Sequence, residues 1–232
     1  TRLGGVLVRT PDQKWKRLDT HTNHTVQSVA EIPGAGYFVG TEMLNLFLMD
    51  ASGSIKPVKS DGLPYGKIIF SRYFEKNGLV LAILTKAGLG VYSTASVSAP
   101  NWKLVQLIPN TNNFFLANSP MLAASNDNTI FIGRDDSFFA FDLRTNNWSV
   151  QKTNFSILQL AARNDLIWAR GSSFLSKKTY LSSNGGQTWE ETNSRDSDSI
   201  LLFTNASEAY SISEDQGGMV KYTPDGGKTF FN

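Results

Sequence analysis

The sequence contains no cysteine and only two histidines among its 232 residues. The first absence excludes disulfides, thiolate metal sites and a cysteine nucleophile at once. The two histidines, His21 and His24, share the segment THTNHT, and a metal held there would need a third ligand such as Asp19 or Glu42. A solvent-exposed loop is the simpler interpretation, so we expect neither a metal site nor a cofactor.

Long apolar runs and long charged blocks are also absent. No run approaches the roughly 18 residues of a transmembrane helix, and the first residues, TRLGGVLVRT, lack the pattern of a signal peptide. Charged residues make up 18% of the chain and the net charge is only +2, so we expect neither nucleic acid nor membrane insertion. The abundance of Asn, Ser and Thr favours a secreted or periplasmic protein whose signal has been removed.

Helical periodicity is missing as well, and a repeat takes its place. No window of about 11 residues carries a convincing apolar stripe at helical spacing, so helices should be scarce. Large apolar anchor residues follow turn-rich stretches at intervals of 40, 47, 46, 41 and 41 residues, and four of the five Trp fall in this register. The anchors are Trp15, Ile55, Trp102, Trp148, Trp189 and Phe230.

Between the anchors, short runs rich in β-branched and aromatic residues are bounded by Gly, Asn, Asp, Ser or Pro, which is typical of strands. Four strands in about 40–45 residues is the spacing of a β-propeller blade. We therefore predict an all-β protein, a β-propeller of four-stranded antiparallel blades in which each anchor packs between neighbouring blades. The single domain would span 1–232, with a partial blade at 1–18 and complete blades at about 19–59, 60–107, 108–152, 153–193 and 194–232.

The partial blade leaves three interpretations open. Residues 1–18 supply only two strands, GVLVRT and KWKRLD, while the last blade already has its own anchored strand. The chain is then a six-bladed ring whose first blade lacks its inner strands, a fragment of a longer propeller, or a five-bladed ring with an extra hairpin on its edge. The incomplete ring is the preferred interpretation, because an unpaired edge strand needs cover.

The segment SSNGGQTWEE at 182–191 resembles a functional loop at first sight, but its composition is that of a closed turn. A short Asn or Asp side chain accepts hydrogen bonds from nearby backbone N–H groups, and the Gly after it can take a positive φ. The same order of residues returns some 41 positions later. The two copies consist of Ser182, Asn184, Gly186, Thr188 and Trp189, and of Thr223, Asp225, Gly227, Thr229 and Phe230.

These two copies resemble the Asp-box, or bacterial neuraminidase repeat, of the sialidase-like propeller superfamily, with Asn184 in place of the usual Asp. The stretch TPDQKW at 10–15 looks like a shortened copy. The resemblance implies that the box is structural and lies on the face opposite the substrate-binding face. It also implies a likeness to non-catalytic members, such as the propellers that resemble photosystem assembly factors.

Sialidases of this superfamily use three convergent Arg, a Tyr–Glu pair and an Asp. Their Arg-Ile-Pro segment is missing here, since neither Ile32–Pro33 nor Ile108–Pro109 follows an Arg, and no Gly-x-Ser-x-Gly elbow occurs. The sequence therefore names no catalytic residue. It favours a non-catalytic scaffold that binds a protein partner in a bacterial envelope or extracellular setting, with a glycan-binding or glycoside-hydrolysing protein as the alternative.

The loops that join the second strand to the third, and one blade to the next, form the candidate binding face. The longest, LIPNTNNFFLANSP, holds two Phe that are either exposed anchors or packed under the loop. The segment ARGSSFLSKKTY is basic and aromatic and suits an acidic partner, while GRDDS is a tight and most simply solvated hairpin. The candidate residues are Phe114, Phe115, Arg134, Arg170, Phe174 and Lys177.

Overall fold

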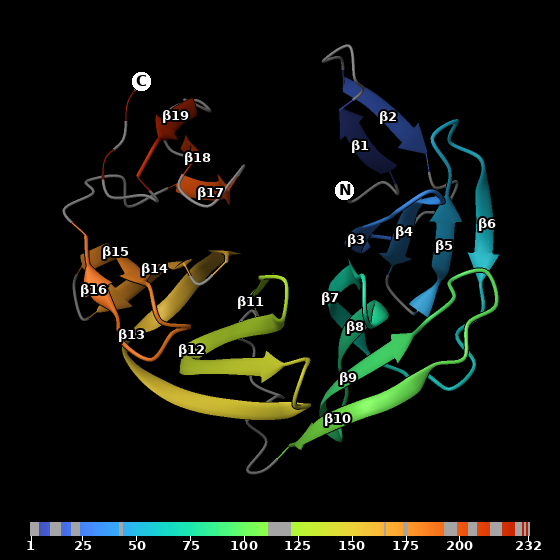
Figure 1. Ribbon diagram of the computed structural model, residues 1–232. Coiled ribbons are helices and arrows are strands. Elements are labelled where there is room, and N and C mark those ends of the chain that lie inside the picture. The colour runs from blue at the N-terminus through green and yellow to red at the C-terminus, as the bar shows by residue number, and fades with distance from the viewer. Residues whose placement is uncertain are drawn as a thin grey trace. The chain divides into compact units, whose positions relative to one another are not determined.

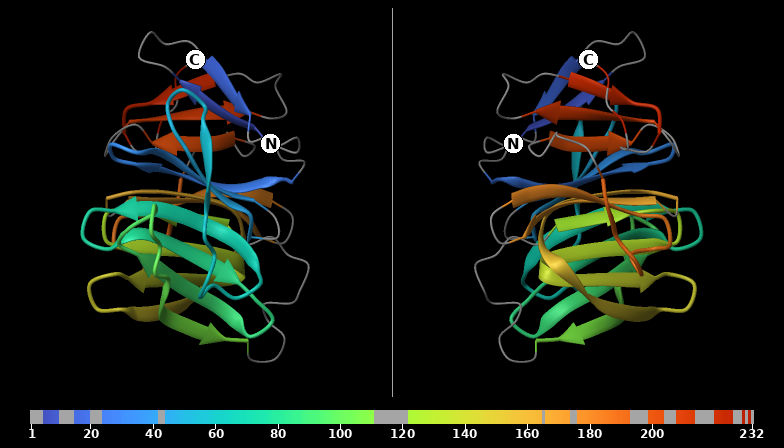
Figure 2. Two further views of the ribbon diagram at one scale, coloured as in Figure 1. Left: turned by 90° about the vertical axis from the view of Figure 1, so that its right-hand side faces the viewer. Right: turned by 90° about the vertical axis from the view of Figure 1, so that its left-hand side faces the viewer.

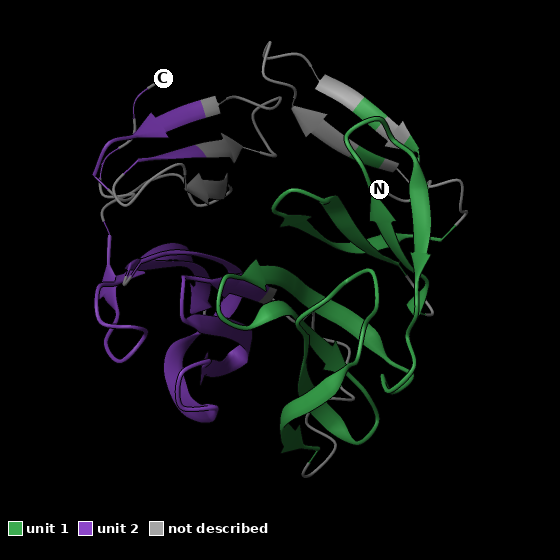
Figure 3. Ribbon diagram, turned by 45° about the vertical axis from the view of Figure 1, so that its right-hand side comes forward, with its two compact units in different colours: residues 1–117 green, residues 118–232 purple. Residues whose placement is uncertain are grey.

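The computed structural model is all-β, as predicted, and its strands pair antiparallel throughout the part that it describes. No α-helix occurs there, and so none that could cross a membrane. The chain divides into two compact units, residues 1–117 and 118–232 (Figure 3). The structure describes residues 5–9, 15–19, 24–41, 44–110, 122–164, 166–173, 176–192, 199–203, 208–213, 220–225, 229 and 231.

The first unit contains a hairpin and two four-stranded sheets (Figures 1 and 2). Its sheets follow the orders β3-β4-β5-β6 and β10-β9-β8-β7, and β3 contacts β7. The strands are β1 (Gly5–Arg9), β2 (Trp15–Asp19), β3 (Val26–Ile32), β4 (Gly36–Thr41), β5 (Leu46–Met49), β6 (Ile55–Val58), β7 (Lys67–Phe74), β8 (Gly78–Leu84), β9 (Gly88–Thr94) and β10 (Lys103–Pro109).

The second unit contains a six-stranded sheet and a three-stranded one. The six-stranded sheet follows the chain from β11 to β16, and β13 also contacts β17 of the three-stranded sheet. The strands are β11 (Leu122–Ser125), β12 (Thr129–Asp142), β13 (Asn147–Arg163), β14 (Leu166–Ser173), β15 (Ser176–Ser182), β16 (Glu190–Glu191), β17 (Ser199–Phe203), β18 (Ala209–Ser213) and β19 (Val220–Thr223).

Two long strands of the second unit, β12 and β13, each occupy the place of two shorter strands. Asp135 has a positive φ of 48°, and Leu143 N–H donates to Asn128 O at 2.8 Å, so β12 folds back on itself as a hairpin. Strand β13 pairs with β12 through residues 147–152 and with β14 through 156–163. Strand β13 therefore ends one four-stranded array and begins the next. In the last sheet, Phe231 forms an antiparallel bridge with Tyr222 of β19.

The inner strands are buried on both faces. In β8, GLVLAIL, Leu79 to Ile83 are all fully buried, which explains why this run is continuously apolar rather than alternating. Each unit forms its own apolar clusters. One contains Phe38, Ile68, Leu81 and Trp102 in the first unit, and another contains Phe131, Phe138, Phe155 and Tyr180 in the second.

Three of the anchors contact residues of the preceding repeat. Trp102 is buried and its Nε1–H donates to Lys59 O at 2.9 Å, while Ile55 packs in the cluster that contains Val6. Trp189 meets the rings of Phe138 and Phe155 edge-on, with centroids 5.3 and 5.6 Å apart. Trp148 packs against Phe141, and the side chains of Trp15 and Phe230 lie outside the described residues.

In the five repeats whose turn between the third and fourth strands is described, one side chain at the same place closes that turn. At each of these turns, an oxygen at the end of the third strand accepts a backbone N–H from the loop that follows it. Only two of these turns have the full box, but all five have a hydrogen-bond acceptor at the position of its first residue, the Ser or Thr. The accepting residues are Asp50, Thr94, Asp142, Ser182 and Thr223.

Candidate functional site

The first box is a closed hydrogen-bonded turn. Asn184 Oδ1 accepts from Thr188 N–H at 2.9 Å and from Ser182 Oγ at 3.0 Å, and Ser182 Oγ accepts from Gly186 N–H at 2.8 Å. Gly186 has a φ of 88°. Its polar side chains therefore bond mainly to the turn itself.

The second box repeats this pattern with one difference. Asp225 Oδ1 accepts from Thr229 N–H at 2.9 Å and from Thr223 Oγ1 at 2.9 Å. Thr229 Oγ1 donates to Asp225 Oδ2 at 2.6 Å, whereas in the first box Asn184 Nδ2 donates to Thr188 Oγ1 at 2.9 Å. The exchange of Asp for Asn thus reverses one hydrogen bond and removes one negative charge. Gly227 and Phe230 lie outside the described residues.

The structure describes three of the six residues of the predicted binding face, namely Arg134, Arg170 and Lys177; Phe114, Phe115 and Phe174 lie outside the described residues. All three belong to the second unit. The residues that follow the two arginines, Asp135 and Gly171, are both strand partners of Ile157. The two arginines therefore lie two strands apart at one end of the sheet, which we call the arginine end (133–137, 156–159, 170–173 and 176–179).

Arg134 is fully buried, so the solvated hairpin predicted for GRDDS describes only part of this turn. Its Nε lies 3.7 Å from Asp135 Oδ2. Asp136 is exposed and accepts from Lys152 Nζ at 2.5 Å, and this hydrogen bond lowers the pKa of Asp136. The sequence alone could not show that Arg134 is buried while Asp136 is exposed, because burial depends on which face of the strand the neighbouring structure covers.

Arg170 is 7% exposed and stands in a polar row across three strands. Its direct strand partners are Gln159 on β13 and Thr179 on β15, and side chains of such partners share a face of the sheet. Gln159 Oε1 and Thr179 Oγ1 are buried and have no hydrogen-bond partner in the described part of the chain. Lys177 lies two residues before Thr179 on the same face and is exposed.

Lys178, which follows Lys177, forms an ion pair. Lys178 Nζ donates to Glu191 Oε2 at 2.8 Å, and this hydrogen bond raises the pKa of Lys178. Arg144, by contrast, binds Asp142 at the opposite end of the strands and cannot join Arg134 and Arg170. No group of three or more His, Asp or Glu side chains in the described ranges is placed to hold a metal ion.

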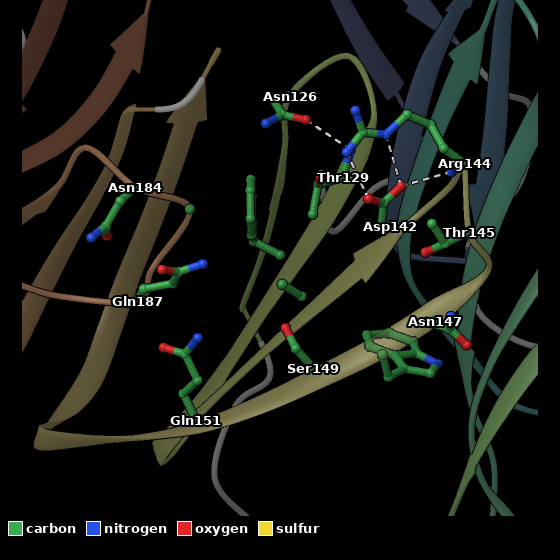
Figure 4. Close-up of a pocket in the computed structure, with 14 residues that line it drawn as sticks. Asn126, Thr129, Asp142, Arg144, Thr145, Asn147, Ser149, Gln151, Asn184 and Gln187 are labelled. Carbon is green, nitrogen blue, oxygen red and sulfur yellow. Dashed lines mark hydrogen bonds and ion pairs between the residues drawn. The ribbon is translucent and has the colours of Figure 1, made fainter.

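A hollow of about 390 Å³ lies at that opposite end of the second unit (Figure 4). Its walls come from the turns around 126, 142–147 and 184–187. Because several Asn and Gln side chains line it, we call this the amide end. Sequence reasoning missed it, and the only local signal was the run of amides in TNNWSVQ at 145–151. The lining residues are Asn126, Thr129, Phe131, Ala140, Asp142, Arg144, Thr145, Asn147, Trp148, Ser149, Gln151, Asn184, Gly185 and Gln187.

The sequence matches no protein-family model and no curated protein. Solved structures do match. YCF48 bound to a D1 peptide shares 15% identity, with a TM-score of 0.69 over 97% of this chain and 74% of that one. The Cps50 (Swd1) β-propeller domain of Myceliophteria thermophila shares 9%, with a TM-score of 0.63 over 100% and 80%.

A third similar structure is that of PorZ, a bacterial surface component of the type-IX secretion system of Porphyromonas gingivalis. It shares 16% identity, with a TM-score of 0.50 over 90% of this chain and 29% of that one. Identities this low show the fold alone. Together with the antiparallel four-stranded sheets, they show that the chain has a β-propeller fold.

Proposed function

We propose that this protein is a non-catalytic β-propeller scaffold that binds an acidic segment of a protein partner at the arginine end of its second unit. The proposal depends on the position of Arg170, which is 7% exposed and lies between its strand partners Gln159 and Thr179. The exposed Lys177 lies on the same face of the sheet. A guanidinium presents a planar fork of donors that matches a carboxylate. An arginine already fixed in a strand loses little conformational entropy on binding.

The surroundings of this arginine suit a polar contact. Gln159 and Thr179, the direct strand partners of Arg170, place polar side chains on both sides of it. Lys177, which is exposed, would attract the acidic segment before contact.

Similar structures support the kind of ligand and the setting. YCF48 was solved with a bound peptide, which demonstrates peptide binding by a propeller of similar structure. PorZ is a bacterial surface component, which supports the secreted or periplasmic setting that we propose. The single-domain ring over 1–232 and its blade count stay part of the same proposal.

The test measures fluorescence anisotropy with three labelled peptides of equal length that are rich in Glu, in Gln or in Lys. The Glu-rich peptide should bind best and should weaken as salt rises, because exposed charges are screened. Lys177→Glu should weaken it about tenfold or more, since a like charge replaces an attraction. Lys86→Glu is the matched control, because Lys86 is an exposed lysine at the β8–β9 turn of the first unit.

Arg170→Gln should abolish Glu-rich peptide binding, with circular dichroism to confirm that the variant folds. Equal affinity for the three peptides would contradict the proposal. So would a Lys177→Glu variant that binds the Glu-rich peptide like the wild type.

Glycoside hydrolysis is the second candidate function. Its only support is the resemblance of the two boxes to the Asp-box of the sialidase-like superfamily. Within the second unit, Arg144 binds Asp142 at the amide end, so it does not adjoin Arg134 and Arg170. Turnover of a fluorogenic sialoside, lost in Arg134→Ala or Arg170→Ala, would replace the scaffold proposal with this one.

A further inference from the structure

The amide end has a hollow whose chemistry differs from that of the arginine end. Five carboxamide side chains line it, from Asn126, Asn147, Gln151, Asn184 and Gln187, together with the hydroxyls of Thr129, Thr145 and Ser149. Figure 4 shows Gln151 and Gln187 projecting toward one another across the hollow. These groups come from β12, from β13 and from the turns around 126, 145 and 184–187, so only the folded sheet brings them together.

Much of this hydrogen-bonding capacity is unused within the protein. No side-chain hydrogen bond in the described part of the chain engages Asn147, Ser149, Gln151 or Gln187. A carboxamide offers two donors and one acceptor, so the three amides alone present donors and acceptors in several directions. Such a surface suits a ligand that is itself rich in both.

The hollow is also electrically neutral. Its single acid and single base neutralise each other, because Arg144 donates to Asp142 through Nε at 3.1 Å and through Nη2 at 2.7 Å. Figure 4 shows the Asn126 amide pointing toward the same guanidinium. The first box contributes Asn184 where the second has Asp225, so the rim lacks the negative charge of a complete box. An anionic or cationic ligand would find no unpaired opposite charge among the lining residues.

Apolar surface completes the site. Trp148 is half-buried and borders the hollow, next to Phe131 and Ala140. Ligand pockets typically combine such a ring with a few convergent polar groups, in volumes of about 300–1,000 Å³. The C–H face of a pyranose packs on an indole while its hydroxyls donate and accept. A charged peptide or a nucleotide matches neither the neutrality nor the number of amides.

We propose that the hollow at the amide end binds one or two residues of a neutral oligosaccharide. Gln151, Gln187, Asn147 and Ser149 would hydrogen-bond the sugar hydroxyls, and Trp148 would carry its apolar face. The site is independent of the arginine end, which lies at the other end of the same strands. Because the hollow is open, the affinity should be weak, with a Kd on the order of millimolar.

The test is saturation-transfer difference NMR on the whole chain with maltotriose, cellotriose and N,N′-diacetylchitobiose, and with sialyllactose and a Gly-Asn-Gly-Gln peptide for comparison. At least one neutral oligosaccharide should receive saturation. Gln151→Ala and Gln187→Ala should each weaken it about tenfold, as expected for the loss of a hydrogen bond or two. Gln187 is exposed and Gln151 is half-buried, and circular dichroism checks that both variants fold.

A control variant comes from the first unit, where a smaller hollow of about 310 Å³ beside the β9–β10 turn has no aromatic ring in its lining. Asn101→Ala in that hollow should leave binding unchanged. The proposal is overturned if none of the three neutral sugars receives saturation. It is equally overturned if saturation is the same in the Gln151→Ala and Gln187→Ala variants, or if the peptide or sialyllactose binds better than every neutral sugar.

Discussion

At the scale of single residues, Gly186 shows how little freedom the box leaves. Its φ is 88°, and a Cβ placed on it would lie 2.2 Å from Phe138 Cε1. Gly185 also has a positive φ, of 70°, but a Cβ there would meet nothing within 4 Å. An alanine at Gly185 would therefore introduce backbone strain alone, whereas an alanine at Gly186 would add a steric clash with Phe138.

We predict that Gly186→Ala destabilises the fold by about 3 kcal/mol, because the cost of positive φ and the displacement of a buried ring add together. Gly185→Ala should cost only about 1–2 kcal/mol, the backbone component alone. Urea unfolding of both variants measures the difference. Equal losses would show that Phe138 moves aside freely.

The carboxylate of Asp142 gives a prediction for pH. Hydrogen bonds from the Arg144 side chain hold the pKa of Asp142 below its ordinary value. A depressed pKa in the folded state stabilises the protein above the unfolded pKa of about 3.9, and this contribution is lost as pH falls through the folded pKa. The stability advantage of the wild type over Asp142→Asn should thus shrink between neutral pH and pH values below 4. Denaturant titrations of both proteins test this, and a gap that does not change with pH would contradict it.

At the scale of elements, the turn after each third strand depends on one acceptor. Ser182 Oγ takes the buried N–H of Gly186. Ser182→Ala should cost about 1–3 kcal/mol, because it leaves that N–H without a partner. Ser182→Thr should stay close to the wild type, since Thr223 plays the same part in the second box. Thermal unfolding compares the three proteins, and a Thr variant as unstable as the Ala variant would refute the role assigned to the hydroxyl.

The spacing of the anchors is the element-level feature that sequence reasoning read best. The sequence predicts Trp102 and Trp189 between neighbouring repeats, and they contact Lys59 O and Phe138 of the repeats that precede them. The periodicity worked because each repeat must bury a large side chain at the same step. Strand boundaries were less predictable, since the RDDS turn at Asp135 is so tight that β12 runs on without a break.

At the scale of the whole molecule, each compact unit is a stack of sheets whose interiors are apolar and whose chemistry lies at the strand ends. The second unit places basic groups at one end and neutral amides at the other. With a net charge of only +2, no overall field attracts a partner to the whole molecule. We therefore propose that recognition depends on these local ends, and the two proposed sites should respond independently to the variants named above.

The sequence by itself determined the class of fold, the repeat, the closed turns of the two boxes and the basic character of the 170–178 hairpin. These features are local, because turn chemistry and strand patterning act over a few residues and recur at a fixed interval. Only the tertiary structure decided that Arg134 and Arg170 are buried, and that Gln151 and Gln187 line one hollow. Burial and convergence depend on which faces the neighbouring sheets cover, and residues about 40 positions apart carry no local signal of that pairing.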